Sequence, residues 1–164
     1  DLLSIPFAGN EVDVLLDQAI REEYPEVDVP LTMIRKFKES YSYVGESESG
    51  ARVKIPVGGK PRKIEIGKQV GESCNQLLQE VFESIKKVIG MASPQSVFSL
   101  LQNIILTGGG SRIRNFDQEL QRLLADDGYE DPEVTISSRE IKPFVAMGAM
   151  KVAKAARDDQ WVRL

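Results

Sequence analysis

Three consecutive glycines, Gly108, Gly109 and Gly110, form the stretch of this sequence that is best suited to hold a ligand. They follow an apolar run, residues 103–107, that predicts a short buried strand, and they precede a segment with helical periodicity. A glycine turn between a strand and a helix presents backbone N–H groups with no Cβ in the way, which suits a phosphate, a ribose or a purine. A plain tight connection is the alternative, because the turn has neither the Walker pattern nor the dinucleotide-binding pattern of glycines.

The second half of the chain alternates strand and helix around this turn. Ser111 is expected to cap the helix that follows, and residues 133–137 predict a second buried strand. The last segment, residues 142–164, predicts a helix whose small side chains allow close packing against a sheet. This alternation indicates parallel strands covered by helices, and therefore an α/β fold. The apolar positions of the helix after the turn are Ile113, Phe116, Leu120, Leu123 and Leu124.

The first half is mostly helical and contains one hairpin. Apolar residues recur at helical spacing in several segments, whereas they alternate on either side of Gly58 and Gly59, which is typical of a β-hairpin. In chain order the sequence predicts a strand at residues 2–7, a helix within 9–24 capped by Asn10, a helix at 31–43, a hairpin at 51–66, a long helix at 67–91 and a short helix opened by Ser93.

Two groups of charged residues are candidates for binding. The second helix carries Arg35, Lys38 and Glu39 away from its apolar face, where a solvated flank is the simplest interpretation. A group of cations lies in and just after the hairpin, and it is typical either of edge protection or of contact with an acidic partner or a membrane surface. These cations are Arg52, Lys54, Lys60, Arg62, Lys63 and Lys68.

Composition narrows the function further. The chain has no histidine, which excludes a Ser-His or Cys-His nucleophile within it, and its single cysteine, Cys74, is expected to fill the core in a reducing cytosol. The net charge of −4 gives no reason to expect a nucleic-acid partner. No apolar run approaches the roughly 18 residues that a membrane span needs. The start of the chain has no signal-peptide pattern, and the missing initiator Met suggests an excised or processed piece.

Four blocks of the sequence, in the same order and spacing, resemble the second lobe of bacterial actin-fold proteins of the MreB/MamK family. The blocks are NIILTGGGSRIRNFDQEL, AGNEVDVLLDQAI, IRKFKESYSYVG and PFVAMGAMKVA. The resemblance implies an actin-like ATPase fold, related to ribonuclease H, of which this chain holds the second lobe only. Residues 1–8 and 67–164 would form the inner α/β subdomain, and residues 9–66 a mainly helical outer insertion that carries the hairpin.

The same resemblance assigns nucleotide contacts. The third block carries a Lys-Glu pair in which the carboxylate can accept from ribose hydroxyls and the cationic stem can cover a purine face. Sliding that helix along the family pattern would place Lys36 there in place of Lys38. The residues implied are Gly108, Gly109, Gly110 and Ser111 on the phosphate–ribose side, Arg112 and Ile113 beside the adenine, Lys38 and Glu39 toward adenine and ribose, and Arg35 one turn earlier.

The resemblance also implies a function. The full-length protein would be a cytoplasmic, filament-forming ATPase that binds ATP or ADP with Mg and self-associates, whereas both phosphate loops and the catalytic groups are absent from this chain. We therefore expect no catalytic or metal-binding residue here, weak or no nucleotide binding by the chain alone, a partner in the missing N-terminal lobe, and at most indirect membrane contact. The amino-acid sequence of residues 35–44 and the WVRL tail resemble the MamK branch, which positions magnetosome chains. An MreB-like cell-shape filament, a sugar-kinase or chaperone relative, and a non-polymerising partner-binding module are the alternatives.

Overall fold

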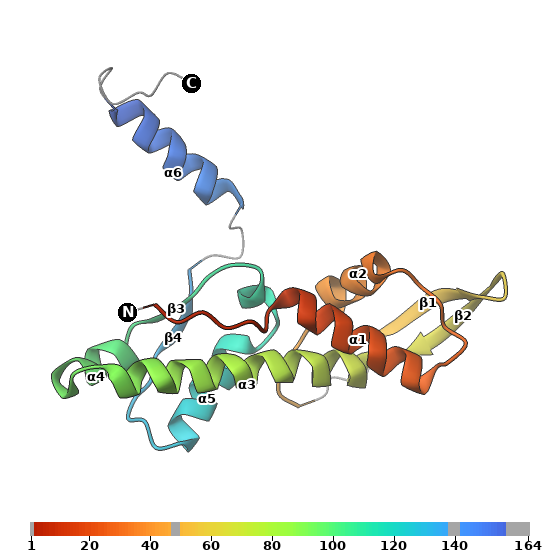
Figure 1. Ribbon diagram of the computed structural model, residues 1–164, viewed down its shortest axis with the longest axis horizontal. Helices are drawn as coiled ribbons and strands as arrows, with labels where there is room; N and C mark the ends of the chain where they lie inside the picture. Colours follow the sequence, from red (N-terminus) through yellow and green to blue (C-terminus); the bar gives the residue numbers. More distant parts are fainter. Residues whose placement is uncertain (1, 47–49, 138–141, 157–164) are drawn as a thin grey trace.

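The computed structural model describes residues 2–46, 50–137 and 142–156. Figure 1 shows an elongated arrangement in which the long helix α3 runs beside most of the other elements. The elements are α1 (Gly9–Glu23), α2 (Leu31–Tyr41), β1 (Arg52–Val57), β2 (Lys60–Glu65), α3 (Gly67–Met91), α4 (Pro94–Leu101), β3 (Ile104–Leu106), the short 3₁₀ helix η1 (Gly110–Arg112), α5 (Phe116–Asp126), β4 (Val134–Ile136) and α6 (Lys142–Ala155). None of the helices in these ranges combines the length and the apolar character needed to cross a membrane.

Helix α3 organises the core, as its apolar stripe predicts. It packs against α1, α2 and α5, and Val70, Cys74 and Leu78 on its inner face are buried. The Cys74 side chain is fully enclosed, and this burial raises the pKa of its thiol to about 11 because the charged thiolate would lose its hydration. The prediction that Cys74 fills the core is confirmed.

The hairpin of β1 and β2 is also confirmed. The two strands pair antiparallel with Val53 opposite Ile64, and both side chains are buried. Gly58 and Gly59 make the turn with φ values of 55° and 77°, a conformation that suits the twist of a two-residue hairpin and that glycine adopts without strain. The hairpin forms one end of the molecule in Figure 1.

Strands β3 and β4 pair in parallel, as the strand–helix alternation predicts, with Ile104 opposite Val134 and Leu106 opposite Ile136. The expectation that the β3 segment is fully buried is wrong. Ile105 is 63% exposed, because its side chain points to the sheet face that no element in the described ranges covers. Helix α5 packs against β4 and covers the other face.

Two expectations for the start of the chain are wrong. Residues 2–7 form no strand, because no other described segment lies alongside to share a hydrogen-bond ladder and Pro6 has no N–H to donate. Asn10 does not cap α1 but lies within it. The helix begins at Gly9, and Glu11 accepts a hydrogen bond from the backbone N–H of Ala8 at 3.0 Å, which satisfies one donor of the helix start.

The segment after the glycines differs from the expected simple helix start. The chain first forms η1 and then enters α5 through Asn115, whose φ of 63° places it in the left-handed region that asparagine tolerates. Ser111 is therefore not a helix cap. Its hydroxyl donates to the carbonyl of Gly108 at 2.9 Å, which closes the turn upon itself.

Helix α6 lies apart from the other elements in Figure 1. Residues 146–152 are exposed, including Met147, Met150 and Val152. The expected close packing of its small side chains on a sheet is thus not found in the described part of the chain. Small side chains on a helix permit close approach to a sheet, but they do not by themselves provide a sheet to pack against. The WVRL tail lies outside the described residues.

Candidate functional site

A cleft of about 550 Å³ opens between α2 and the glycine turn. Residues from α1, α2, α3 and η1 meet around it, although they are distant in the sequence. The cleft is lined by Ala8, Gly9, Val12, Lys38, Glu39, Ser42, Leu77, Gly109, Gly110, Arg112 and Ile113. Six of the nine residues assigned to the nucleotide by resemblance are in this lining.

The glycine wall of the cleft is bare main chain. Gly108 has a φ of 90°, which suits glycine, and it turns the chain into Gly109. A Cβ on Gly109 would meet no atom within 4 Å, and a Cβ on Gly110 would meet only Leu77 Cδ2 at 3.9 Å. The turn therefore leaves room for a ligand to lie against the backbone of both residues.

The turn is held from inside by its own hydrogen bonds. The N–H of Arg112 donates to the carbonyl of Gly109 at 3.2 Å, and the N–H of Ile113 donates to that of Gly110 at 3.1 Å. Ser111 is buried and, like Gly108, does not line the cleft. These two residues support the wall from behind, and their neighbours Gly109, Gly110 and Arg112 line the cleft.

The opposite wall is the polar flank of α2, and Lys38 and Glu39 have different environments there. The Lys38 ammonium lies 2.5 Å from Asp13 Oδ1 and donates to the Gly9 carbonyl at 2.7 Å, so its charge is already paired. Lys38 is nevertheless among the residues that line the cleft. The Glu39 side chain is exposed, and it brings a carboxylate to the same wall. Lys36, the alternative to Lys38, is not among the lining residues.

Arg35 lies outside the cleft lining. Its Nε donates to Asp13 Oδ2 at 2.8 Å, and its Nη2 donates to Asn10 Oδ1 at 3.0 Å. The hydrogen bond and the charge of Asp13 raise the pKa of Arg35. Arg35 and Lys38 together neutralise Asp13, which is fully buried at the α1–α2 contact. Two of the charged residues on the polar flank of α2 are therefore paired with a buried carboxylate. The expectation that this flank is simply solvated is wrong for Lys38.

Asp13 is the residue of this region whose role the sequence reasoning missed. In the sequence it follows the expected cap Asn10 by three residues, where a capping box usually has Glu, and that position alone indicates no buried role. A signal was available, because Asp13 adjoins Val12 and lies on the same stripe as Leu16 and Ile20, all of which are buried. A carboxylate at a core position of a helix requires a cation from a neighbouring element, and α2 supplies two.

Comparison with solved structures identifies the class of fold. The MamK double helical filament matches with a TM-score of 0.83 and 30% identity, covering 94% of this chain and 47% of that one. A non-polymerising MamK mutant bound to AMPPNP matches with a TM-score of 0.83 and 30% identity, covering 93% and 46%. MreB5 of Spiroplasma citri bound to ADP, at 18% identity and a TM-score of 0.70 over 92% and 45%, shares the fold. The chain has an actin-like fold, as the resemblance implies.

The family follows from the sequence comparisons. The chain belongs to the MreB/Mbl protein family, whose model matches residues 2–159. It is 30% identical over 164 residues to the actin-like protein MamK of Paramagnetospirillum magneticum, and 31% identical over 165 residues to that of Magnetospirillum gryphiswaldense. It covers 46% and 45% of these relatives, so it spans about half of their length. The predicted resemblance to the MamK branch is confirmed.

Proposed function

We propose that this chain is the adenosine-contacting lobe of a bacterial actin-like filament protein. The observation that carries the proposal is the cleft, in which bare glycine backbone faces an exposed carboxylate across α2 and η1. Two relatives with solved structures are bound to AMPPNP or ADP, and MamK forms a double helical filament. The full-length protein is proposed to hydrolyse ATP as it polymerises, and the chain alone is proposed to bind nucleotide weakly or not at all.

In this proposal the ribose lies beside Glu39, whose carboxylate accepts hydrogen bonds from its hydroxyls. The purine lies between Arg112 and Ile113 on one side and the stem of Lys38 on the other, while the phosphates begin at Gly109. Mg would enter with the nucleotide. In the described ranges no cluster of three or more His, Cys, Asp or Glu side chains is placed to hold a metal ion, so its protein ligands would come from the rest of the protein.

The remaining assignments follow the same family pattern. We propose that residues 1–8 and 67–164 form the inner subdomain and residues 9–66 the outer one, that the missing N-terminal lobe closes over the cleft, and that the filament works in the cytoplasm. The MamK relatives favour a filament that positions an intracellular structure such as a magnetosome chain. Cell-shape control, as in MreB, is the second candidate, because the family model covers both branches.

Replacing Glu39 by glutamine in the full-length protein tests the adenosine position. We expect ATP affinity to fall about fivefold to tenfold, because glutamine keeps one acceptor oxygen but its neutral hydrogen bond contributes about 1 kcal/mol less than a charged one. Affinity for 2′,3′-dideoxy-ATP should be almost unchanged, because that ligand lacks the ribose hydroxyls. Titration calorimetry measures both. Ser40→Ala, at the next position of α2, is the matched control. An equal loss for both ligands would contradict the placement of the ribose at Glu39.

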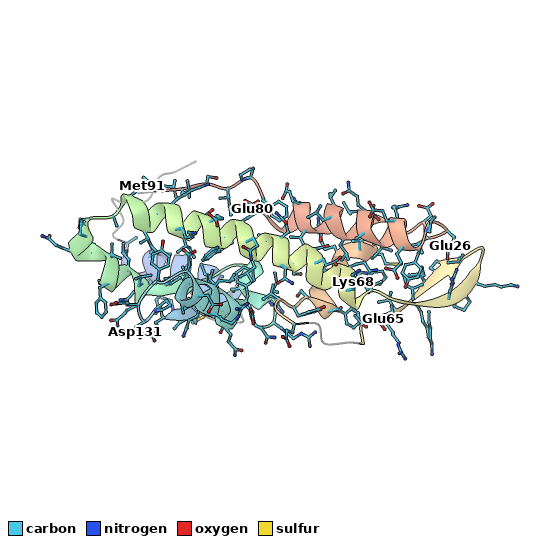
Figure 2. The ribbon with its side chains drawn as sticks, turned by 90° about the horizontal axis from the view of Figure 1, so that it is seen from below. Glu26, Glu65, Lys68, Glu80, Met91 and Asp131 are labelled. Atoms are coloured by element: carbon cyan, nitrogen blue, oxygen red, sulfur yellow. The ribbon has the colours of Figure 1, made fainter. Side chains whose placement is uncertain are left out.

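The hairpin is proposed to contact the next protomer of the filament. Lys54 and Lys63 lie directly opposite each other on the exposed face, an arrangement of like charges that destabilises a strand pair. We call these two residues the lysine pair. Other cations of this region have partners: Arg52 with Glu65 at 3.1 Å, Arg62 with Glu26, and Lys68 with Glu72 at 3.8 Å. Figure 2 shows Glu26, Glu65 and Lys68 at the hairpin end of α3, away from Met91.

Substituting the lysine pair by glutamate in the full-length protein tests this interface. The double variant Lys54→Glu, Lys63→Glu keeps two like charges opposite each other, so the internal repulsion of the hairpin stays about the same while its external charge reverses. We expect filaments to disappear or to become much shorter in electron micrographs at matched protein concentration. Lys36→Glu, Lys87→Glu changes the net charge equally at exposed positions outside the hairpin. Normal filaments from the lysine-pair variant would remove the hairpin from the interface.

A further inference from the structure

The two walls of the cleft are joined directly by main-chain hydrogen bonds. Tyr43, just after α2, forms an isolated parallel β-bridge with Arg114, just after η1. The N–H of Val44 donates to the Arg114 carbonyl at 3.1 Å, and the N–H of Arg114 donates to the Ser42 carbonyl at 3.3 Å. The Arg114 Nε also reaches the Ser42 carbonyl, at 3.4 Å. This bridge lies next to the lining residues Ser42 and Ile113, so it sets how far apart the walls are held.

The side chain of Tyr43 fixes the bridge to α3. It is 3% exposed, and its hydroxyl donates to the carbonyl of Gly67 at 3.0 Å. The hydroxyl and the ring lie against Gly71, where a Cβ would be 2.3 Å from the tyrosine oxygen and 2.6 Å from its Cζ. Residue 71 therefore has to be glycine if Tyr43 keeps this position. The same helix supplies Leu77 to the floor of the cleft.

We infer that Tyr43 is a positioning residue that sets the width of the cleft. Its hydroxyl ties the bridge between α2 and the glycine turn to α3, the helix that also contributes Leu77 to the cleft. Gly71 has no side chain and therefore leaves space for the tyrosine ring. Tyr43 does not line the cleft and would not touch a nucleotide. Its effect on affinity would come from the distance it imposes between Glu39 and Gly109. This inference rests on the proposed nucleotide site for its consequence, but not for its geometry.

Tyr43→Phe removes only the hydroxyl and leaves the ring. The matched control is Tyr24→Phe, which removes a similar bond, from a tyrosine hydroxyl to the Glu65 carbonyl at 3.1 Å, at the other end of α1 from the cleft. A hydrogen bond of this kind corresponds to about a fivefold change in an equilibrium. In the full-length protein we expect the two variants to lose similar stability, whereas only Tyr43→Phe lowers affinity for ADP, about fivefold by titration calorimetry.

A second readout needs no nucleotide. Hydrogen exchange of the amides of Val44 and Arg114, which make the bridge, should be about fivefold faster in Tyr43→Phe than in the wild type, and unchanged in Tyr24→Phe. Gly71→Ala should accelerate the same amides, although alanine is normally preferred to glycine within a helix. Gly90→Ala, in the same helix with open space around its Cβ, should leave them unchanged.

The outcomes distinguish the positioning role of Tyr43 from the proposed nucleotide-binding function. Faster exchange at the bridge together with weaker ADP binding supports the inference. Equal exchange and equal ADP affinity in Tyr43→Phe and Tyr24→Phe would overturn it, even if the wild type binds ADP. A wild-type protein that binds no ADP, but whose bridge amides respond to Tyr43→Phe, would overturn the proposed function and leave the positioning role of Tyr43 supported.

Discussion

Gly109→Val in the full-length protein is expected to reduce affinity for ATP and ADP by at least about tenfold, or about 1.4 kcal/mol, while the fold is retained. Gly109 has φ of −64° and ψ of −36°, a helical conformation that valine adopts without strain. The new Cβ would find no protein atom within 4 Å, so its methyl groups would take up space in the cleft instead of disturbing the core. Titration calorimetry with each nucleotide measures the loss.

Two further variants serve as controls for Gly109→Val. Gly109→Ala adds a single methyl group and should give a smaller loss, in proportion to the space filled. Gly90→Val adds the same side chain at an open helix position away from the cleft and should leave affinity unchanged. If Gly109→Val folds normally and binds ATP as the wild type does, the glycine turn is only a tight connection between β3 and η1.

Asp13→Asn is expected to destabilise the fold by about 2–3 kcal/mol. The substitution removes the charge that neutralises Lys38 and Arg35, whose side chains are 16% and 46% exposed. Breaking a fully buried ion pair costs about 3–5 kcal/mol, and the partial exposure of Arg35 reduces the expected loss because water can solvate its guanidinium. Urea unfolding followed by circular dichroism measures the change in the free energy of unfolding.

Asp17→Asn is the matched control on the same helix. Asp17 pairs with Arg21 at 2.9 Å, one turn along the α1 surface, and its side chain is 24% exposed. An exposed pair of this kind contributes about 0–1 kcal/mol, so the control should lose much less stability than Asp13→Asn. Equal losses in the two variants would show that the contact of Asp13 with α2 is no stronger than a surface ion pair.

The sequence predicted the hairpin, the long helix and the parallel pairing of β3 with β4, because each follows from a local pattern that tertiary contacts reinforce. Alternation around Gly58 and Gly59 defines a hairpin without help from the rest of the chain. The i, i+4, i+7 spacing of Val70, Cys74 and Leu77 likewise defines one helix face. The glycine turn was located by the same kind of reasoning, and its bare backbone does face a cleft.

The failures share a different cause, since each depended on a partner that no local pattern reveals. Residues 2–7 have the composition of a strand but no neighbouring strand in the described ranges. Ser111 has the chemistry of a helix cap, but a 3₁₀ turn intervenes and its hydroxyl bonds to Gly108. The roles of Asp13 and Tyr43 arise only when α1, α2 and α3 come together. Long-range contacts decide such positions, and single-residue preferences do not.

Helix α3 has a mechanical consequence. Its 25 residues correspond to a rod about 37 Å long, at 1.5 Å per residue, which carries Gly67 near the hairpin and Leu77 at the cleft. Because a continuous helix without a kink only curves gently, a displacement at the hairpin end of α3 would be transmitted along the helix to Leu77. Strain applied at the hairpin by a neighbouring subunit would therefore reach the proposed adenosine cleft through α3.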